Sequence, residues 1–273
     1  MKLTGRTAVV TGCGPNIGAA IALALAGEGA GIACVDAEAL FADKCAEDVR
    51  TAGGRAEPFV CDVRDEGQVR ATVDRVVERM GGVDVLLNGV AVRIGKGLLD
   101  TSLEEFRLQM DVILTGTFLF TKYAAEAMIR LGRRGSIINL ISTEGHQGYP
   151  GSIGYGTAKS GLLNFTRSAA MELAEHGIRV NSLTPTSTDP AEGIERAQQW
   201  GVPARLHDPK PPSFSPGVVG VPLRRLPSPK HYGTAVVFLA SDDSEMVTGF
   251  DLRVDAGVVA RYWRWQPDGM PAR

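Results

Sequence analysis

Two polar residues, one helical turn apart, have the types and the spacing for acid–base chemistry. Tyr155 and Lys159 lie four positions apart in the segment 155–177, whose pattern predicts a long helix, so both project from one face. A phenol is a weak acid at neutral pH because its reference pKa is about 10. A neighbouring ammonium and the positive ring of an oxidised nicotinamide both favour the phenolate. The pair therefore predicts proton transfer by Tyr155, with Lys159 lowering its pKa.

A serine completes this predicted catalytic group. Ser142 comes at the end of the apolar run GSIINLIS, which predicts a buried strand. At a strand end its hydroxyl can hydrogen-bond and polarise a substrate oxygen. Lys159 can also hold the ribose of a nicotinamide nucleotide, and the hydride chemistry belongs to that cofactor. Ser142, Tyr155 and Lys159 together predict the interconversion of a secondary alcohol and a ketone.

A glycine-rich turn near the N terminus has the context of a dinucleotide-binding loop. Its glycines let the backbone turn tightly and approach a pyrophosphate at the N terminus of the next helix. The spacing is not GxGxxG, so the prediction depends on the strand before the turn and the helix after it. The residues predicted to contact the cofactor here are Gly12, Gly14, Asn16, Ile17 and Gly18.

An acidic residue at the end of the next predicted strand bears on cofactor choice. Asp36 lies about twenty residues beyond the turn, where a carboxylate binds the adenosine ribose hydroxyls and repels a 2′-phosphate. The alternative is a solvated strand end or a helix cap. No arginine or lysine occurs at 13–17 or 37–41, so NAD is favoured over NADP. Asp62 and Val63 close the third strand, within reach of the adenine edge.

Short apolar runs alternate along the chain with longer amphipathic stretches. The runs are rich in valine and isoleucine and do not alternate with polar residues, as expected of parallel strands covered on both faces. This alternation predicts a single α/β domain over residues 1–273, a doubly wound parallel sheet (Rossmann fold) with three α/β/α layers. The predicted strands are 7–12, 31–36, 56–63, 83–90, 135–142, 178–185 and 251–257.

Two segments depart from this alternation of predicted strands and helices. Residues 186–230 are rich in proline, and a long irregular loop at the carboxyl edge of a sheet is either a substrate lid or a disordered segment. We interpret it as a substrate-loop insertion that forms a lid. The C-terminal tail, 258–273, is unusually aromatic. Such a tail is expected to be buried against another subunit, with packing onto its own domain as the alternative.

Composition excludes several classes of function. The net charge is 29 − 31 = −2 without a basic block, so neither nucleic acid nor an anionic membrane is an expected partner. We expect no signal peptide and no membrane span, which makes the cytoplasm the predicted location. The four cysteines form no CxxC pair and are interpreted as buried thiols in a reducing compartment. The histidines show no metal-ligand spacing, so no metal is predicted.

The motifs together resemble the short-chain dehydrogenase/reductase family over essentially the whole chain. The matching pieces are TGxxxxIG at 11–18, Asp36, Asp62–Val63, Ser142, YxxxK at 155–159, IRVNSLTP at 178–185, and the segment 236–257.

The resemblance implies roles for individual residues. Ser142, Tyr155 and Lys159 would carry catalysis, with Tyr155 as the proton donor or acceptor. The strand ending at Pro185 would be followed by a backbone contact from Thr188 to the nicotinamide carboxamide. The family also implies a homotetramer or homodimer with long helices in the interface.

Four departures from the family pattern stand out. Asn16 replaces the middle glycine of the fingerprint, and asparagine tolerates a positive φ better than other residues. The family's Asn-Asn-Ala-Gly reads Asn88-Gly89-Val90-Ala91, and Thr186 replaces a glycine. The resemblance still implies cofactor contacts from Asn88, Gly89 and Pro185, and from Tyr155 and Lys159. Ile113 replaces the family's fourth catalytic residue, an asparagine that helps to hold a water next to the lysine. The backbone carbonyl at 113 can still bind that water, so we expect slower proton relay.

Several loop residues are predicted to contact the substrate, which their mixed chemistry suggests is a partly apolar small molecule with a polar substituent. His146 is interpreted as lining the pocket, with a role as an additional acid–base group as the alternative. The candidates are Arg93, Ile94, Glu144, His146, Gln147, Tyr149, Trp200 and Phe214.

Two other functions remain open at this point. The altered fingerprint and Ile113 favour an NAD-binding protein with little or no turnover and a binding or regulatory role. Intact Ser142, Tyr155 and Lys159 argue against it. A different enzyme class on this fold, such as a hydrolase or a sugar-nucleotide epimerase, is disfavoured because the chain has no GxSxG motif and is short for a larger substrate domain.

Overall fold

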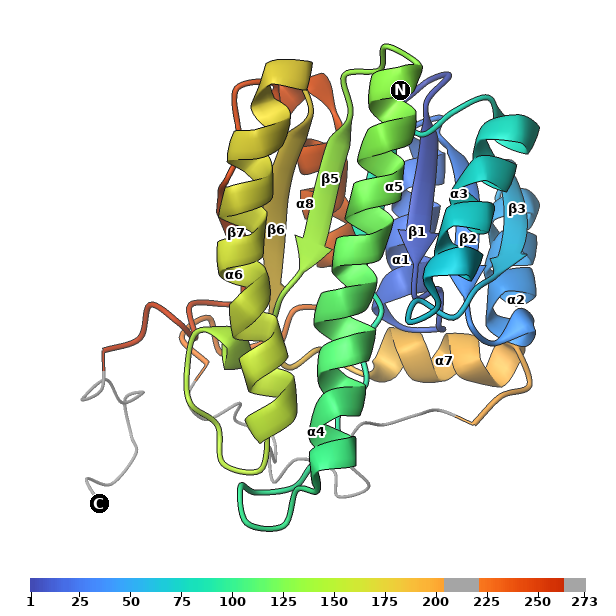
Figure 1. Ribbon diagram of the computed structural model, residues 1–273. Coiled ribbons are helices and arrows are strands. Elements are labelled where there is room, and N and C mark those ends of the chain that lie inside the picture. The colour runs from blue at the N-terminus through green and yellow to red at the C-terminus, as the bar shows by residue number, and fades with distance from the viewer. Residues whose placement is uncertain (204–220, 263–273) are drawn as a thin grey trace.

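A seven-stranded parallel sheet forms the middle of three layers in the computed structural model, which describes residues 1–203 and 221–262 (Figure 1). The strand order is β3-β2-β1-β4-β5-β6-β7, and all neighbouring strands are parallel. The predicted doubly wound fold and all seven predicted strands are confirmed. The strands are β1 (Thr7–Thr11), β2 (Gly31–Asp36), β3 (Arg55–Val60), β4 (Val85–Asn88), β5 (Ser136–Leu140), β6 (Arg179–Pro185) and β7 (Asp251–Val254).

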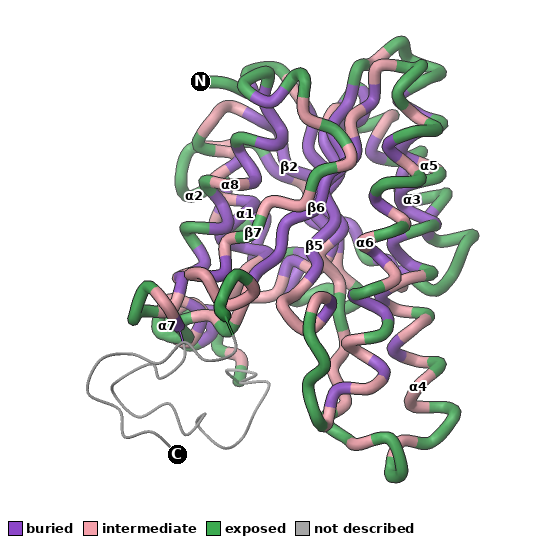
Figure 2. Tube along the Cα trace, turned by 90° about the vertical axis from the view of Figure 1, so that its left-hand side faces the viewer, coloured by how far each residue is buried: buried purple, intermediate pink, exposed green. Residues whose placement is uncertain are grey.

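Helices cover both faces of the sheet and enclose one apolar cluster on each (Figure 2). One face carries α1 (Ile17–Gly27), α2 (Ala39–Thr51) and α8 (Pro229–Ala240). The other carries α3 (Glu66–Met80), α5 (Gly116–Arg130) and α6 (Ile153–Leu173). The remaining elements are α4 (Leu103–Met110), the π-helical turn η1 (Asp111–Thr115), α7 (Ala191–Gln199) and the 3₁₀ turns η2 (Thr143–Gly145), η3 (Ala174–His176) and η4 (Asp242–Ser244).

The order of the strands reverses between β1 and β4, and the loops that follow these strands approach each other closely. A Cβ atom on Gly89 would lie 2.6 Å from the Thr11 carbonyl oxygen. Gly12 adopts a φ of +79° directly opposite Gly89. Both positions therefore require glycine. Such a switch point at the carboxyl edge is where doubly wound sheets bind ligands.

One continuous helix contradicts the expectation that no segment resembles a membrane span. Residues 103–130, which comprise α4, η1 and α5, form the one described helix that is long and apolar enough to cross a membrane. However, 56% of its most apolar window is buried inside the protein. The helix contacts α3 and α6 and contributes to the core on that face of the sheet. Its apolar character is accounted for by this packing, as in the core helix of a soluble protein.

The proline-rich insertion is more ordered at its start than expected. It begins with α7, a nine-residue helix that lies below the carboxyl edge of the sheet, across the ends of α1 and α2 (Figure 1). The predictions for Phe214 and for the aromatic residues of the tail beyond Tyr262 lie outside the described residues.

Candidate active site

The glycine-rich loop leads from β1 into α1 and is held by its own backbone. A Cβ atom on Gly18 would lie 1.9 Å from the Gly12 carbonyl oxygen, so the first turn of α1 packs directly on the loop. No side chain among the described residues caps the N terminus of α1. Uncapped amide groups and the positive end of a helix dipole favour an anion. The loop therefore fits the pyrophosphate of a dinucleotide.

Asn16 fits this loop for a different reason from the one expected. Its φ is −96°, so its position does not require a positive φ, and the prediction based on that tolerance was wrong. A Cβ atom on Gly193 would lie 3.0 Å from the Asn16 side chain, which places Asn16 against α7. Its Oδ1 is buried without a hydrogen-bond partner among the described residues. Asn16 thus packs against α7 rather than serving as a conformational substitute for glycine.

Asp36 ends β2 beside the loop. Its Oδ1 accepts a hydrogen bond from the Glu38 amide at 3.1 Å, and its carboxylate also accepts from the Cys13 amide of the loop. Burial raises its pKa, and these amide groups lower it. The adjacent Glu38 adds a second negative charge. Two acidic side chains therefore lie at the end of β2, beside the glycine-rich loop.

Helix α7 clamps the outside of the loop, and Trp200 belongs to this clamp. Arg196 donates a hydrogen bond to the Pro15 carbonyl at 2.8 Å. The Trp200 indole donates to Asp48 of α2 at 3.0 Å and packs against Phe41, with ring centroids 6.3 Å apart. Only 5% of Trp200 is exposed. Its prediction as a substrate contact was wrong, because the chain turns after β6 towards α2 and buries the indole there.

Asn88 also differs from its predicted role in cofactor binding. Its amide donates to the Thr121 hydroxyl at 3.1 Å and to Asn139 at 2.9 Å, inside the core. Because both N–H groups are used to join β4, β5 and α5, the side chain has no donor left for a cofactor. Asn139 in turn donates to Thr166 of α6 at 3.0 Å.

The sequence predicts that Asp62 and Val63 contact the adenine and that Thr188 contacts the nicotinamide carboxamide. All three lie at the carboxyl edge of the sheet, and each has a partner within the protein. The Asp62 carboxylate is held by the Arg64 guanidinium, which lowers the pKa of Asp62. Val63 is buried against Gly116 of α5. Beyond Pro185, the Thr188 hydroxyl lies 3.1 Å from the Tyr232 hydroxyl of α8.

Ser142, Tyr155 and Lys159 converge at the same edge, as predicted. The Lys159 ammonium lies 5.7 Å from the centroid of the Tyr155 ring, because one turn of α6 separates the two residues. Lys159 is 2% exposed and donates to the Leu140 carbonyl at 2.5 Å. The Ser142 hydroxyl is hydrogen-bonded to Tyr155 and accepts from the Glu144 amide at 3.2 Å.

Burial is the largest electrostatic influence on Tyr155 and Lys159. Burial raises the pKa of Tyr155 to about 12, whereas the Ser142 hydroxyl and the Arg93 guanidinium lower it and Glu144 raises it. Burial also lowers the pKa of Lys159 to about 7. Burial disfavours both the charged ammonium of Lys159 and the phenolate of Tyr155. The lowering of the Tyr155 pKa by Lys159 and a bound oxidised nicotinamide together stays a prediction for the cofactor-bound protein.

Three of the predicted substrate residues form one charged cluster next to Tyr155. An Arg93 nitrogen lies 3.4 Å from a Glu144 oxygen, and the Arg93 guanidinium covers the Tyr149 ring at 5.6 Å. The Ser152 hydroxyl donates to Glu144. Arg93 and Glu144 both act on the pKa of Tyr155, which places this cluster within electrostatic reach of the phenol.

His146 and Gln147 line the same hollow as Glu144 and Tyr149, as predicted, but each has a partner of its own. His146 Nε2 lies 3.1 Å from the Thr184 hydroxyl and 3.2 Å from Asp251 Oδ2, so the imidazole joins η2 to β6 and β7. Gln147 is exposed and donates to the Val258 carbonyl at 3.5 Å, at the start of the tail. His146 is therefore a structural link rather than an acid–base group facing Tyr155.

Ile113 occupies the π-helical turn that joins α4 to α5. Its side chain is fully buried and packs in a small apolar cluster with Ile141, Leu162 and Ala158, the residue that precedes Lys159 in α6. π-Helical turns are rare and occur often at functional sites. The neighbourhood that would hold a water through a polar side chain is apolar here.

Four residues of the site and its supports were not predicted from the sequence, namely Arg196, Asp48, Ser152 and Asp251. Arg196 donates to Pro15, 181 positions away in the chain, and Trp200 donates to Asp48, 152 positions away. No motif marks such contacts, since they depend on the path of the chain after β6. A signal was available only for Ser152, which lies in the segment between Ser142 and Tyr155.

Comparison with known proteins is consistent with this geometry. A family model described as Enoyl-(Acyl carrier protein) reductase matches residues 12–259. The chain is 36% identical over 261 residues to the 2,5-dichloro-2,5-cyclohexadiene-1,4-diol dehydrogenase of Sphingobium indicum, which covers 94% of this chain and 98% of that protein.

Two solved structures are similar over nearly the whole chain. A short-chain type dehydrogenase/reductase from Mycobacterium marinum has a TM-score of 0.81 and 30% identity, covering 94% of this chain and 96% of that one. NAD⁺-bound xylitol dehydrogenase has a TM-score of 0.81 and 34% identity, covering 93% and 99%. This chain therefore belongs to the short-chain dehydrogenase/reductase family, whose members are oxidoreductases with a nicotinamide cofactor.

Proposed function

We propose that this protein is an NAD(H)-dependent oxidoreductase that interconverts a secondary alcohol and a ketone. The observation that carries the proposal is the convergence of Ser142, Tyr155 and Lys159 at the carboxyl edge of the sheet. The glycine-rich loop and Asp36 lie along the same edge, at the reversal of strand order. Nucleotide and substrate would therefore meet above β1, β4 and β5.

Each of the three residues has one task in this mechanism. NAD(H) supplies the acceptor or donor of hydride when it is bound. Tyr155 passes a proton between its phenol oxygen and the substrate oxygen. Ser142 donates a hydrogen bond to that oxygen and holds it in place. Lys159 holds the nicotinamide ribose from the buried side of α6.

The preference for NAD over NADP is proposed from charge. Asp36 and Glu38 place two carboxylates where the adenosine ribose would bind, and negative charge repels a 2′-phosphate. The similar xylitol dehydrogenase was solved with NAD⁺. Because burial raises the pKa of Asp36, its hydrogen bonds to backbone amides matter for keeping the carboxylate charged.

The substrate is proposed to be a small molecule with a polar substituent beside its reacting carbon. Arg93 and Glu144 supply both signs of charge next to Tyr155, and the Tyr149 ring adds an apolar surface. Two similar proteins are named for polyhydroxy substrates, a cyclohexadiene diol and xylitol. A second hydroxyl group would satisfy the donors and acceptors of this cluster.

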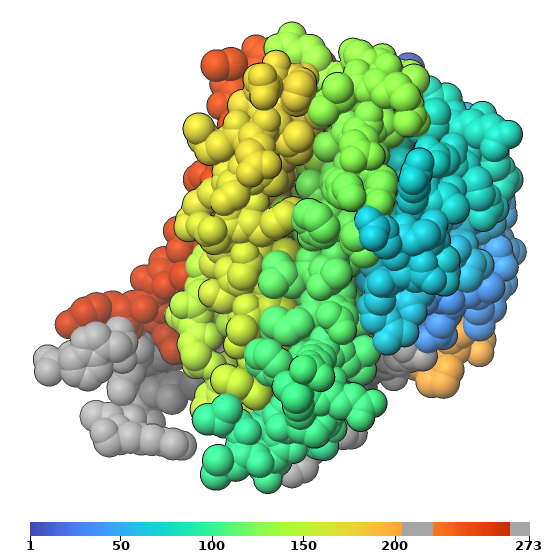
Figure 3. All heavy atoms as spheres, in the orientation of Figure 1, coloured from blue at the N-terminus to red at the C-terminus, as the bar shows by residue number. Residues whose placement is uncertain are grey.

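Assembly into a homodimer or homotetramer is proposed through the exposed surface of α5 and α6. These helices lie side by side on one face of the molecule (Figure 3). Phe118 and Phe165 line a hollow between them, and 47% of Phe118 is exposed.

A cytoplasmic location is proposed from the four free, buried cysteines, which suit a reducing compartment. Residues 1–273 are proposed to form one domain, with α7 as the first part of a lid.

The second candidate function is NAD binding with little turnover. The observation in its favour is Ile113, whose side chain lies in an apolar cluster between η1 and α6 that also includes Tyr155. The two functions differ in turnover and not in nucleotide affinity, so both quantities must be measured on the same preparation.

A panel of secondary alcohols with NAD⁺, followed by NADH absorbance, tests the proposal. Tyr155→Phe is the matched variant, because it removes only the hydroxyl group. We expect its turnover to fall by roughly 10²–10⁴-fold, the range for a lost general acid–base group, with NADH affinity in a fluorescence titration nearly unchanged. Normal turnover by Tyr155→Phe would exclude the phenol as proton donor. Tight NADH binding without turnover on any alcohol or ketone would favour the second function.

A further inference from the structure

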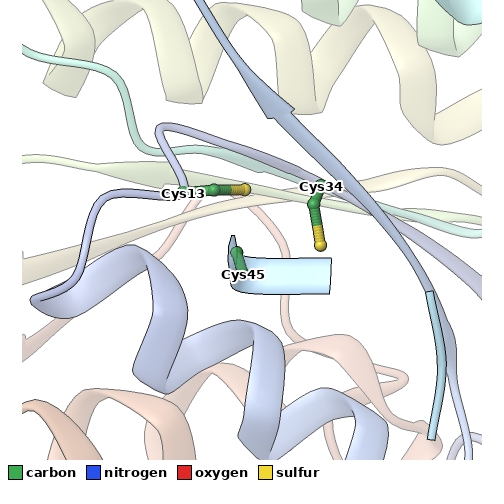
Figure 4. Close-up of side chains that lie close together, drawn as sticks. All are labelled: Cys13, Cys34 and Cys45. Atoms are coloured by element: carbon green, nitrogen blue, oxygen red, sulfur yellow. The ribbon is translucent and has the colours of Figure 1, made fainter. Parts of the chain in front are cut away.

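Three of the four cysteines converge in the core behind the glycine-rich loop (Figure 4). Cys13 comes from the loop, Cys34 from β2 and Cys45 from α2, so 32 positions of sequence separate the first from the last. Their sulfur atoms lie within 4.8 Å of one another, and all three residues are fully buried. The spacing in the sequence gave no sign of this cluster.

The geometry suits three-fold coordination. Three sulfur ligands around one ion at about 2.3 Å would lie about 4.0 Å apart, less than 1 Å closer than the upper limit observed here. Within residues 1–203 and 221–262, no histidine or carboxylate joins the group. Thiolate ligands select zinc as well as copper(I), but zinc in structural sites is almost always four-coordinate, so a set of three sulfur ligands favours copper(I). The absence of water-exposed surface on the cysteines disfavours a water as the fourth ligand.

Three converging sulfur atoms, with no carboxylate or histidine of the described residues beside them, form a soft donor set, and a soft cation is the ligand that such a set attracts. Each thiol that becomes a ligand releases its proton to solvent.

We propose that Cys13, Cys34 and Cys45 form a three-sulfur site for one soft monovalent cation of the copper(I) type. All three cysteines are fully buried, so the ion would enter through a local opening of the protein. Cys13 belongs to the same loop whose amide contacts Asp36, so an occupied site would hold this loop against β2 and α2.

Anaerobic titration of the full-length, reduced protein tests this site. The acetonitrile complex of copper(I) is added in the presence of a chromogenic copper(I) chelator, and the protein is expected to withdraw one equivalent. Cys34→Ala and Cys45→Ala should each lower the affinity at least about 100-fold. Cys61→Ala is the matched control, because Cys61 is equally buried but packs on the opposite face of the sheet. It should bind copper(I) as the unmodified protein does.

Three results would overturn the proposal. The first is a copper(I) affinity of the unmodified protein no higher than that of Cys45→Ala. The second is an equal loss in Cys61→Ala, and the third is zinc binding as tight as copper(I) binding. If the cluster variants fail to fold by circular dichroism, X-ray absorption of the unmodified protein with one equivalent of copper(I) decides. Three sulfur neighbours are expected, and two or fewer would exclude the site. NADH titration of the metal-free protein tests the proposed function separately.

Discussion

The cofactor-binding end and the substrate-binding end of the candidate site consist of different kinds of residue. The cofactor end consists of backbone and small residues, where Gly18 leaves no room for a Cβ atom against Gly12. The substrate end consists of long charged side chains from separate loops, with Arg93 and Glu144 3.4 Å apart. Packing determines the first end, and electrostatics determines the second. Substitutions should therefore alter stability and nucleotide affinity at one end, and pH dependence and turnover at the other.

Among the substitutions, Gly18→Ala at the cofactor end is expected to have the largest effect on stability and nucleotide affinity. The added Cβ atom would lie 1.9 Å from the Gly12 carbonyl oxygen, so the backbone must move. We expect a loss of about 3 kcal/mol of unfolding free energy, measured by urea denaturation, with NADH affinity reduced more than tenfold. Gly14→Ala is the control, because no atom lies within 4 Å of its added Cβ. Equal stability of the two variants would contradict the packing argument.

A smaller effect is expected where α7 meets α2. Trp200→Phe retains a ring against Phe41 but loses the hydrogen bond to Asp48. A hydrogen bond to a charged group contributes about 1.5 kcal/mol or more, so the free energy of unfolding, measured by thermal denaturation, should fall by a comparable amount. The KM for NAD⁺ should rise while the KM for the alcohol stays constant. A change confined to the KM for the alcohol would indicate instead that Trp200 contacts the substrate.

The substrate end is tested by Glu144→Gln. The Glu144 carboxylate raises the pKa of Tyr155, because a negative charge disfavours the phenolate. Removing that charge should lower the pKa, so alcohol oxidation, which needs the phenolate, should reach its plateau at lower pH. The measurement is kcat against pH, with unfolding free energy as a check on structure. A profile displaced to higher pH would show that the loss of the partner of Arg93 outweighs the direct effect.

The smallest effect on rate is expected at Ile113. Ile113→Asn restores a polar side chain beside Lys159 and should raise turnover a few-fold. The position is fully buried, so the variant should also lose about 1–3 kcal/mol of unfolding free energy. Ile113→Val controls for the altered packing and should not raise turnover. Unchanged or lower turnover in Ile113→Asn would argue against a slowed proton relay.

Local patterns accounted for the fold and for part of the site. The seven strands follow from short apolar runs, and Tyr155 and Lys159 share a face because four positions nearly complete one helical turn. The roles expected of Asn88 and Trp200 failed for a common reason. Each side chain is occupied by a partner far away in the sequence, namely Asn139 and Asp48. Sequence spacing carries no information about such partners.

The sequence by itself determined the alternation of strands and helices, the glycine-rich turn and the one-turn spacing of the acid–base pair, because these depend on neighbours within a few positions. Only the tertiary structure decided the ionisation of Tyr155 and Lys159, since burial depends on what the sheet and helices place around them. It likewise brought together Cys13, Cys34 and Cys45. Parallel strands align their carboxyl ends at one edge, and residues distant in the chain become neighbours there.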